Sequence, residues 1–104
     1  MITLKESPIF TKYVDKYLSD DEYAALQWEL LTNPEMGVLI PGSSGLRKIR
    51  WKTQHGGKRG GYRIIYYWHN QQGEIWLLMM YAKNEAENIS AKVLRQIKED
   101  FESE

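Results

Sequence analysis

The stretch GYRIIYYWHNQQGEIWLLMMYA, residues 61–82, carries the strongest structural signal in the sequence. Residues 62–69 are rich in β-branched and aromatic side chains, a composition that is typical of a strand. Residues 70–73, Asn-Gln-Gln-Gly, predict a turn, and residues 75–81 are apolar at consecutive positions. Because a strand that is apolar on both faces lies inside a sheet, the stretch predicts a hairpin whose second strand is central.

Upstream of this hairpin the sequence predicts two more strands. Residues 46–51 predict one of them, and the glycine-rich residues 54–61 predict the tip that joins it to the hairpin. Residues 1–6 alternate weakly between apolar and polar side chains and predict a short first strand. Residues 34–45 are rich in Pro, Gly and Ser and predict a loop.

Three further segments predict helices. Ser7-Pro8 offers an N-cap followed by proline at the first helical position. Ser19-Asp-Asp-Glu22 is a capping box that begins a second helix, and Asn33-Pro34 ends it. Asn88 or Ser90 is expected to cap the third helix. The side chains expected to face the core are Ile9, Phe10, Tyr13, Val14 and Tyr17, then Tyr23, Leu26, Trp28, Leu30 and Leu31, and finally Val93, Leu94, Ile97 and Phe101.

The predicted order is therefore β-α-α-β-β-β-α. It indicates an α+β fold in which two N-terminal helices and a C-terminal helix pack on a small, curved, mainly antiparallel sheet. The chain has 104 residues, so we expect a single domain spanning residues 1–104. It has no cysteine, which excludes disulfides and thiolate metal sites and fits a cytoplasmic location. The start meets charge and proline too early for a secretory signal, and the longest apolar run, residues 75–82, is too short to cross a membrane.

Charge is distributed unevenly along the chain, although the formal net charge is zero. Residues 36–73 carry 7 basic groups and no acidic group. Residues 1–35 carry 3 basic and 7 acidic groups, and residues 74–104 carry 4 basic and 7 acidic groups. Because a carboxylate close to a phosphate costs Coulomb energy, the basic middle segment indicates a polyanionic partner.

Three motifs in this order resemble the RelE/ParE toxin superfamily of bacteria. Residues 45–50, Gly-Leu-Arg-Lys-Ile-Arg, are similar to its second-strand motif, and residues 61–66, Gly-Tyr-Arg-Ile-Ile-Tyr, to its third-strand motif. Residues 81–85, Tyr-Ala-Lys-Asn-Glu, are similar to the stretch just past its fourth strand. The Lys-Arg-Gly-Gly tip at residues 58–61 most resembles the HigB branch, and the resemblance covers nearly the whole chain.

The resemblance implies a RelE-like fold and a definite activity. Such toxins are mRNA interferases that enter the A site of the 30S ribosomal subunit and cut mRNA without a metal or cofactor. Each is neutralised by an antitoxin, which in the HigB branch is a HigA-like helix-turn-helix protein. We therefore expect a cognate antitoxin and ribosome-bound mRNA as partners, and no membrane partner.

The expected catalytic residues are Lys48, Arg50, Arg63 and Lys83. Lys48 and Arg50 are two positions apart on a strand and share one face, and the hairpin can bring Arg63 beside them. RNA cleavage by attack of the 2′-OH on the next phosphate needs cations that stabilise the developing negative charge. It also needs a group that moves a proton, and neighbouring positive charges favour the neutral form of a lysine. A solvated sheet face explains the same charges without any activity.

A second group of residues is expected to contact RNA. Either Lys83 or Asn84 occupies the family's site position after the fourth strand. Lys58 and Arg59 form either an RNA contact or merely a charged hairpin tip. Tyr81 is a candidate contact. The full set is Arg47, Lys52, Lys58, Arg59, Tyr81 and Asn84.

Two observations leave alternatives open. Many relatives place a tyrosine or histidine for proton transfer after the fourth strand, whereas residues 88–90 offer neither here, although His55 in the loop could take part. ParE-like members of the superfamily share the fold but poison DNA gyrase, and a non-catalytic RNA-binding domain could also retain it. The arrangement of Lys48, Arg50 and Arg63 favours RNA chemistry, because a gyrase binder does not need it.

Overall fold

The computed structural model describes residues 1–52, 61–84 and 89–104, and the elements follow the predicted α+β order. One strand of two residues is added within the segment predicted as a loop. The elements are β1 (Thr3–Glu6), α1 (Pro8–Tyr17), α2 (Asp20–Thr32), β2 (Val38–Leu39), β3 (Leu46–Trp51), β4 (Tyr62–His69), β5 (Glu74–Ala82) and α3 (Ala91–Glu102).

The strands form one mixed sheet in the order β1-β5-β4-β3-β2. The predicted meander is confirmed, because β3, β4 and β5 pair antiparallel in succession. The first strand pairs parallel with β5, so β5 lies between two neighbours and its apolar residues are buried on both faces, as the sequence predicted.

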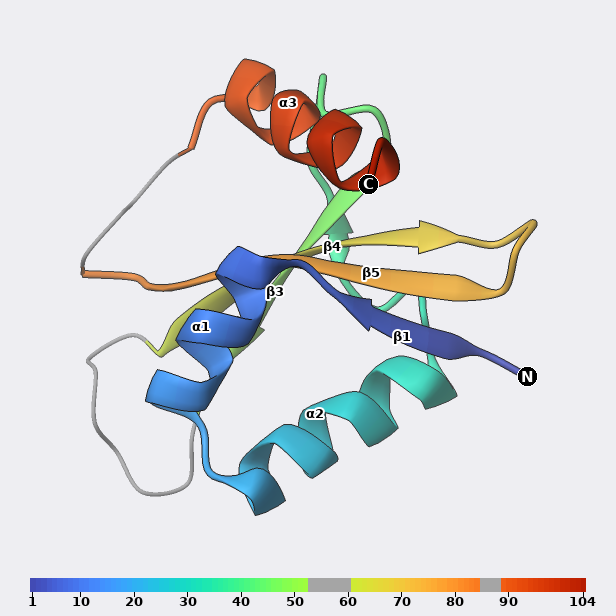
Figure 1. Cartoon of the computed structure of the whole chain (residues 1–104). Coiled ribbons are helices and arrows are strands. Elements are labelled where there is room, and N and C mark those ends of the chain that lie inside the picture. The colour runs from blue at the N-terminus through green and yellow to red at the C-terminus, as the bar shows by residue number, and fades with distance from the viewer. Residues whose placement is uncertain (53–60, 85–88) are drawn as a thin grey trace.

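The helices cover the two faces of the sheet (Figure 1). Helices α1 and α2 pack on one face over a core that includes Phe10, Leu26 and Ile64. Helix α3 lies on the opposite face, where Leu94 packs with Ile65 and other buried side chains. We call the face covered by this helix the α3 face. It carries the candidate site.

The predicted helix starts are confirmed. Ser7 caps α1 with Pro8 at the first position, and Ser19 and Glu22 form both bonds of the capping box of α2. Ser90 caps α3, and the other candidate, Asn88, lies outside the described residues. These caps satisfy backbone N–H groups that have no partner inside a helix.

A β-bulge in β5 determines which side chains share the α3 face. Ile65 is paired with Met79 and Tyr66 with Leu77, so Leu78 is an extra residue without a register partner. The buried Ser7 hydroxyl donates a hydrogen bond of 2.8 Å to the Leu78 carbonyl oxygen. The bulge reverses the facing of the residues after it, and Tyr81 therefore lies on the α3 face.

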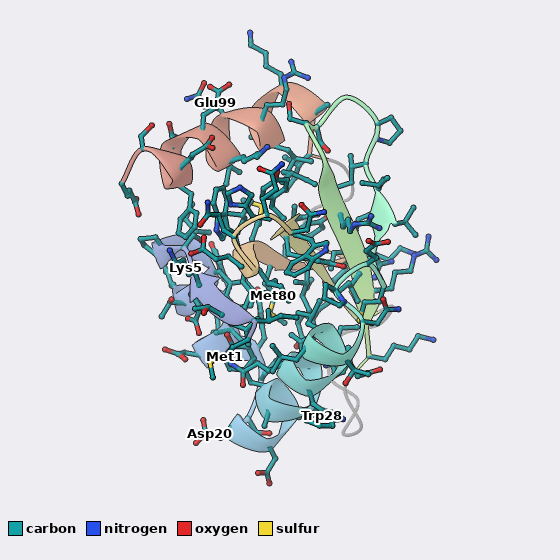
Figure 2. All side chains as sticks on the ribbon, turned by 90° about the vertical axis from the view of Figure 1, so that its right-hand side faces the viewer. Met1, Lys5, Asp20, Trp28, Met80 and Glu99 are labelled. Atoms are coloured by element: carbon teal, nitrogen blue, oxygen red, sulfur yellow. The ribbon has the colours of Figure 1, made fainter. Side chains whose placement is uncertain are left out.

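Three predicted core side chains are exposed instead. Trp28 is 71% exposed, Ile9 43% and Val93 47%. Figure 2 shows Trp28 at the outer side of α2, whereas Met80 lies in the interior. Apolar residues occur around most of α2, so their spacing does not single out the buried side of this helix.

Within the described ranges, no helix has both the length and the apolar character needed to cross a membrane.

Candidate functional site

Three predicted site residues form one row across the sheet. Arg50 on β3 is the register partner of Arg63 on β4, and Arg63 is the register partner of Tyr81 on β5. Because directly paired residues point to the same face, these side chains share the α3 face. They are called the cationic row below.

Exposure differs sharply along this row. Arg50 is exposed, whereas Arg63 is only 7% exposed and Tyr81 9% exposed. Arg63 donates a hydrogen bond of 3.4 Å to the Tyr62 carbonyl oxygen, among other interactions. A guanidinium that is largely removed from water interacts more strongly with an arriving anion than an exposed one does.

The pKa of Tyr81 is affected by its burial and by the neighbouring Arg63. Burial raises the pKa of Tyr81, and the positive charge of Arg63 partly opposes this rise. The phenol is therefore protonated at neutral pH and can donate a hydrogen bond to an oxygen held by the arginines.

Lys48 lies on the same face as the cationic row, one row further along. It is the register partner of Ile65, two residues from Arg63 on β4, a separation of about 7 Å. In the described strands β3 to β5, the one carboxylate is Glu74. Glu74 pairs with His69 at the other end of β4, about 20 Å from Arg63. An anion at the row therefore meets cations and no carboxylate from these strands.

Three other predicted residues lie at the end of the same strands. Lys52 follows β3 directly, and Lys83 and Asn84 follow β5, all with exposed side chains. The Lys83 N–H donates a hydrogen bond of 3.2 Å to the carbonyl oxygen of Gly61, which precedes β4. Lys52 and Lys83 thus add two cations at the end of the sheet near the cationic row.

Arg47 is not brought to this surface. It lies on the opposite face of β3 from Lys48 and Arg50, and its Nη1 donates hydrogen bonds of 3.0 and 2.8 Å to the carbonyl oxygens of Glu35 and Gly37. The Tyr66 hydroxyl contacts the same loop, because it donates a hydrogen bond of 2.6 Å to the Pro34 carbonyl oxygen. Arg47 therefore anchors a loop in this structure.

Lys58, Arg59 and His55 lie outside the described residues, so the predicted roles of the glycine-rich tip stay predictions. Among the described residues, no group of three or more His, Asp or Glu side chains is placed to hold a metal ion.

A pocket adjoins the cationic row, and sequence analysis did not find it. Its cavity volume is about 90 Å³, and it lies between the sheet and the start of α3. Its lining residues come from separate segments that no motif connects, namely Ile40, Lys48, Ile65, Tyr81, Ile89 and Leu94.

Comparison with known proteins identifies the fold. No family model matches the chain. Among solved structures, the chain is similar to the toxin RelE of E. coli, in the free state and with two arginines replaced by alanine. The match has 17% sequence identity and a TM-score of 0.63, and it covers 93% of this chain and 96% of that one. The fold is therefore RelE-like.

Proposed function

We propose that the protein is the toxin of a type II toxin–antitoxin pair and a ribosome-dependent endoribonuclease. The observation that carries this proposal is the cationic row of Arg50, Arg63 and Tyr81 on the α3 face of a RelE-like fold. Both arginines can hold the same phosphate, because they are register partners and strands in a sheet lie about 5 Å apart.

In the proposed reaction the 2′-oxygen of one ribose attacks the adjacent phosphorus, and the bond from phosphorus to the 5′-oxygen breaks. The products are a 2′,3′-cyclic phosphate and a 5′-hydroxyl end. The 2′-OH proton passes to a general base, for which Lys48 and Lys83 are the candidates, and the leaving oxygen takes up a proton. Arg50 and Arg63 stabilise the negative charge on the non-bridging oxygens in the transition state.

The ribosome is the proposed setting for this reaction. Free single-stranded RNA rarely holds the 2′-oxygen in line with the leaving group, whereas an mRNA fixed in the A site can be held in that geometry. Lys52, Lys83 and Asn84 extend the basic surface and are proposed to contact the RNA around the cut. A HigB-type activity, a HigA-like antitoxin and a cytoplasmic location belong to the same proposal.

The proposal is tested by primer extension on mRNA in a reconstituted translation system, with and without ribosomes. We expect wild-type protein to produce cuts only when ribosomes are present. Arg63→Ala should reduce the cleavage rate by about 10²- to 10³-fold, because a preorganised charge at the transition state is lost.

Arg50→Ala and Lys12→Ala are the matched variants, since both change an exposed cation and leave the core intact. The Arg50 variant should lose activity, whereas the Lys12 variant on α1 should keep it. Intact mRNA in the presence of wild-type protein and translating ribosomes would contradict the proposal. A DNA-supercoiling assay would then test the gyrase-directed alternative.

A further inference from the structure

A second pocket lies at the C-terminal end of α2, on the opposite side of the sheet from α3 (Figure 1). Its lining residues are Trp28, Glu29, Thr32, Asn33 and Met36. Trp28 is exposed at the outer side of the helix (Figure 2), whereas tryptophan side chains mostly contribute to cores and interfaces. The cavity volume is about 230 Å³. Pockets for small molecules usually measure about 300–1,000 Å³, so this cavity suits one large side chain of a partner.

The charges around this pocket favour a cation. Residues 17–46, which include α2 and β2, carry 5 acidic groups and no basic group, and Glu29 lines the pocket itself. The last turn of α2 contains no basic residue that would offset the negative end of the helix dipole. Arg47, the next cation along the chain, donates to the carbonyl oxygens of Glu35 and Gly37. Carboxylates repel RNA phosphates, so this surface fits a protein partner rather than RNA.

Arginine is the cation that suits the lining of the pocket. Its planar guanidinium stacks on the face of an indole, and its aliphatic stem packs against apolar side chains. Trp28 provides the indole, Met36 provides an apolar wall, and the Glu29 carboxylate can accept two hydrogen bonds from a guanidinium. Tryptophan is also among the residue types that contribute most to binding at protein interfaces.

An exposed apolar side chain continues this surface toward the edge of the sheet. Leu39 on β2 is the register partner of Arg47, so it lies on the face that α1 and α2 cover, yet it is 55% exposed. The strand β2 is at the end of the strand order, and Met36 of the pocket precedes it by two residues. A matching partner therefore presents an arginine next to apolar side chains.

We propose that this surface docks the antitoxin through an arginine flanked by apolar side chains. It is called the α2 surface below and consists of Trp28, Glu29, Met36 and Leu39. The inference rests on the proposed function, and it adds where on the toxin the antitoxin is held. The α2 surface and the cationic row lie on opposite sides of the sheet, so variants of one can be made without changing the other.

The first experiment tests the arginine pocket with a defined probe. The peptide acetyl-Leu-Arg-Leu-Arg-Leu-amide is added to the protein while the indole N–H signal of Trp28 is followed by NMR. The control peptide carries citrulline, which has nearly the same shape without the charge, in place of each arginine. The arginine peptide should shift the Trp28 signal and bind about 5- to 30-fold more weakly to Glu29→Gln. Equal shifts from both peptides, or none from either, would overturn the inference.

The second experiment measures binding of the antitoxin by titration calorimetry. Trp28→Ala should raise the Kd by about 10- to 100-fold, as loss of an aromatic side chain at the centre of an interface typically does. Because Trp28 is exposed, the variant should keep its thermal stability and its association with ribosomes. In cells, Trp28→Ala should arrest growth as wild type does, and coexpressed antitoxin should restore growth poorly.

Leu39→Asp and Val38→Asp are a matched pair, because both side chains are exposed on β2 and neighbouring residues of a strand point to opposite faces. Leu39→Asp should weaken antitoxin binding, and Val38→Asp should not. The inference is wrong if Trp28→Ala and Leu39→Asp keep the wild-type Kd, or if they weaken association with ribosomes instead. Antitoxin binding through this surface by a protein that cuts no mRNA would preserve the inference and remove the proposed reaction.

Discussion

At the residue scale, Ser7 links a helix start to the bulge that arranges the site. Its hydroxyl oxygen accepts a hydrogen bond of 3.0 Å from the Phe10 N–H and donates one of 2.8 Å to the Leu78 carbonyl oxygen. The first bond caps α1, and the second satisfies a carbonyl group at the bulge in β5. One buried side chain therefore couples the N-terminus to the strand that carries Tyr81.

Ser7→Ala should lower the free energy of unfolding by about 2–3 kcal/mol, because a cap is lost and a buried carbonyl group loses its partner. Ser90→Ala is the control, since this exposed residue only caps α3, with a bond of 3.2 Å from the Val93 N–H. The control should lose about 1 kcal/mol. Urea unfolding measures both values, and equal losses would contradict the role given to the Leu78 bond.

Gly61 is the second residue with a specific requirement. Its φ angle is +72°, and a Cβ atom there would lie 2.5 Å from the Trp51 carbonyl oxygen. Gly61→Ala should therefore destabilise the protein by more than the roughly 1–2 kcal/mol of left-handed strain alone, and it should displace the start of β4 before Arg63.

Gly42→Ala separates strain from collision. Its φ angle is +73°, but the nearest atom to an added Cβ, the Ala91 Cβ, is at an ordinary 3.5 Å. Thermal unfolding should show the larger loss for Gly61→Ala, and the proposed mRNA cleavage should fall in that variant alone. Similar losses in both variants would count against the collision.

At the element scale, β1 is held to β5 by parallel pairing and by a charged contact. Lys5 Nζ lies 2.8 Å from the Glu74 carboxylate, and the Trp76 indole N–H donates to the same carboxylate at 3.0 Å. Lys5 lowers the pKa of Glu74, as does the Trp76 hydrogen bond. The folded protein therefore holds the ionised form of Glu74 more strongly than the unfolded chain does.

This shift predicts a pH dependence. Because the pKa of Glu74 is lowered by folding, its contribution to stability is present above the ordinary value of about 4.3 and is lost as the pH falls through the folded value. Urea unfolding at pH 6 and pH 3 should show a smaller loss of stability in acid for Glu74→Gln than for wild type. An identical pH dependence in the two proteins would remove Glu74 from this role.

The sequence predicted most elements but not how all of them pair. Caps and alternation predicted the helix starts, the meander and the shared face of Lys48 and Arg50, since these depend on neighbouring residues. The parallel pairing of β1 and the two-residue β2 depend on contacts between distant segments. The bulge at Leu78 depends on the register between β4 and β5. The sequence therefore predicted that Tyr81 lies near the site, but it could not predict which face of the sheet Tyr81 is on.

At the scale of the whole molecule, the uneven charge along the sequence gives the α3 face of the sheet an excess of basic residues. The seven basic groups of residues 36–73 include Lys48, Arg50 and Arg63 on the α3 face, and the acidic groups lie in the flanking segments. The zero net charge therefore hides a local excess of positive charge, which can attract RNA phosphates.

The proposed association with ribosomes should consequently weaken as salt rises, because the release of counterions from bound phosphates becomes less favourable. Co-sedimentation with ribosomes at increasing salt measures this, and Arg50→Glu should weaken binding and flatten the salt dependence. Glu29→Lys on α2 changes charge by the same size away from the α3 face, and it should change binding much less. Binding of wild type that does not respond to salt would argue against a phosphate-directed surface.

The parallel pairing of β1 with β5 also determines when β1 can complete its pairing during synthesis. Thr3 is paired with Glu74, roughly 70 residues later in the chain. At about 5–20 residues per second, the first strand and the apolar sides of α1 and α2 wait roughly 4 to 14 seconds for their partner strand. During each round of translation the nascent chain thus exposes Phe10 and Leu26, two side chains that are fully buried once folding is complete.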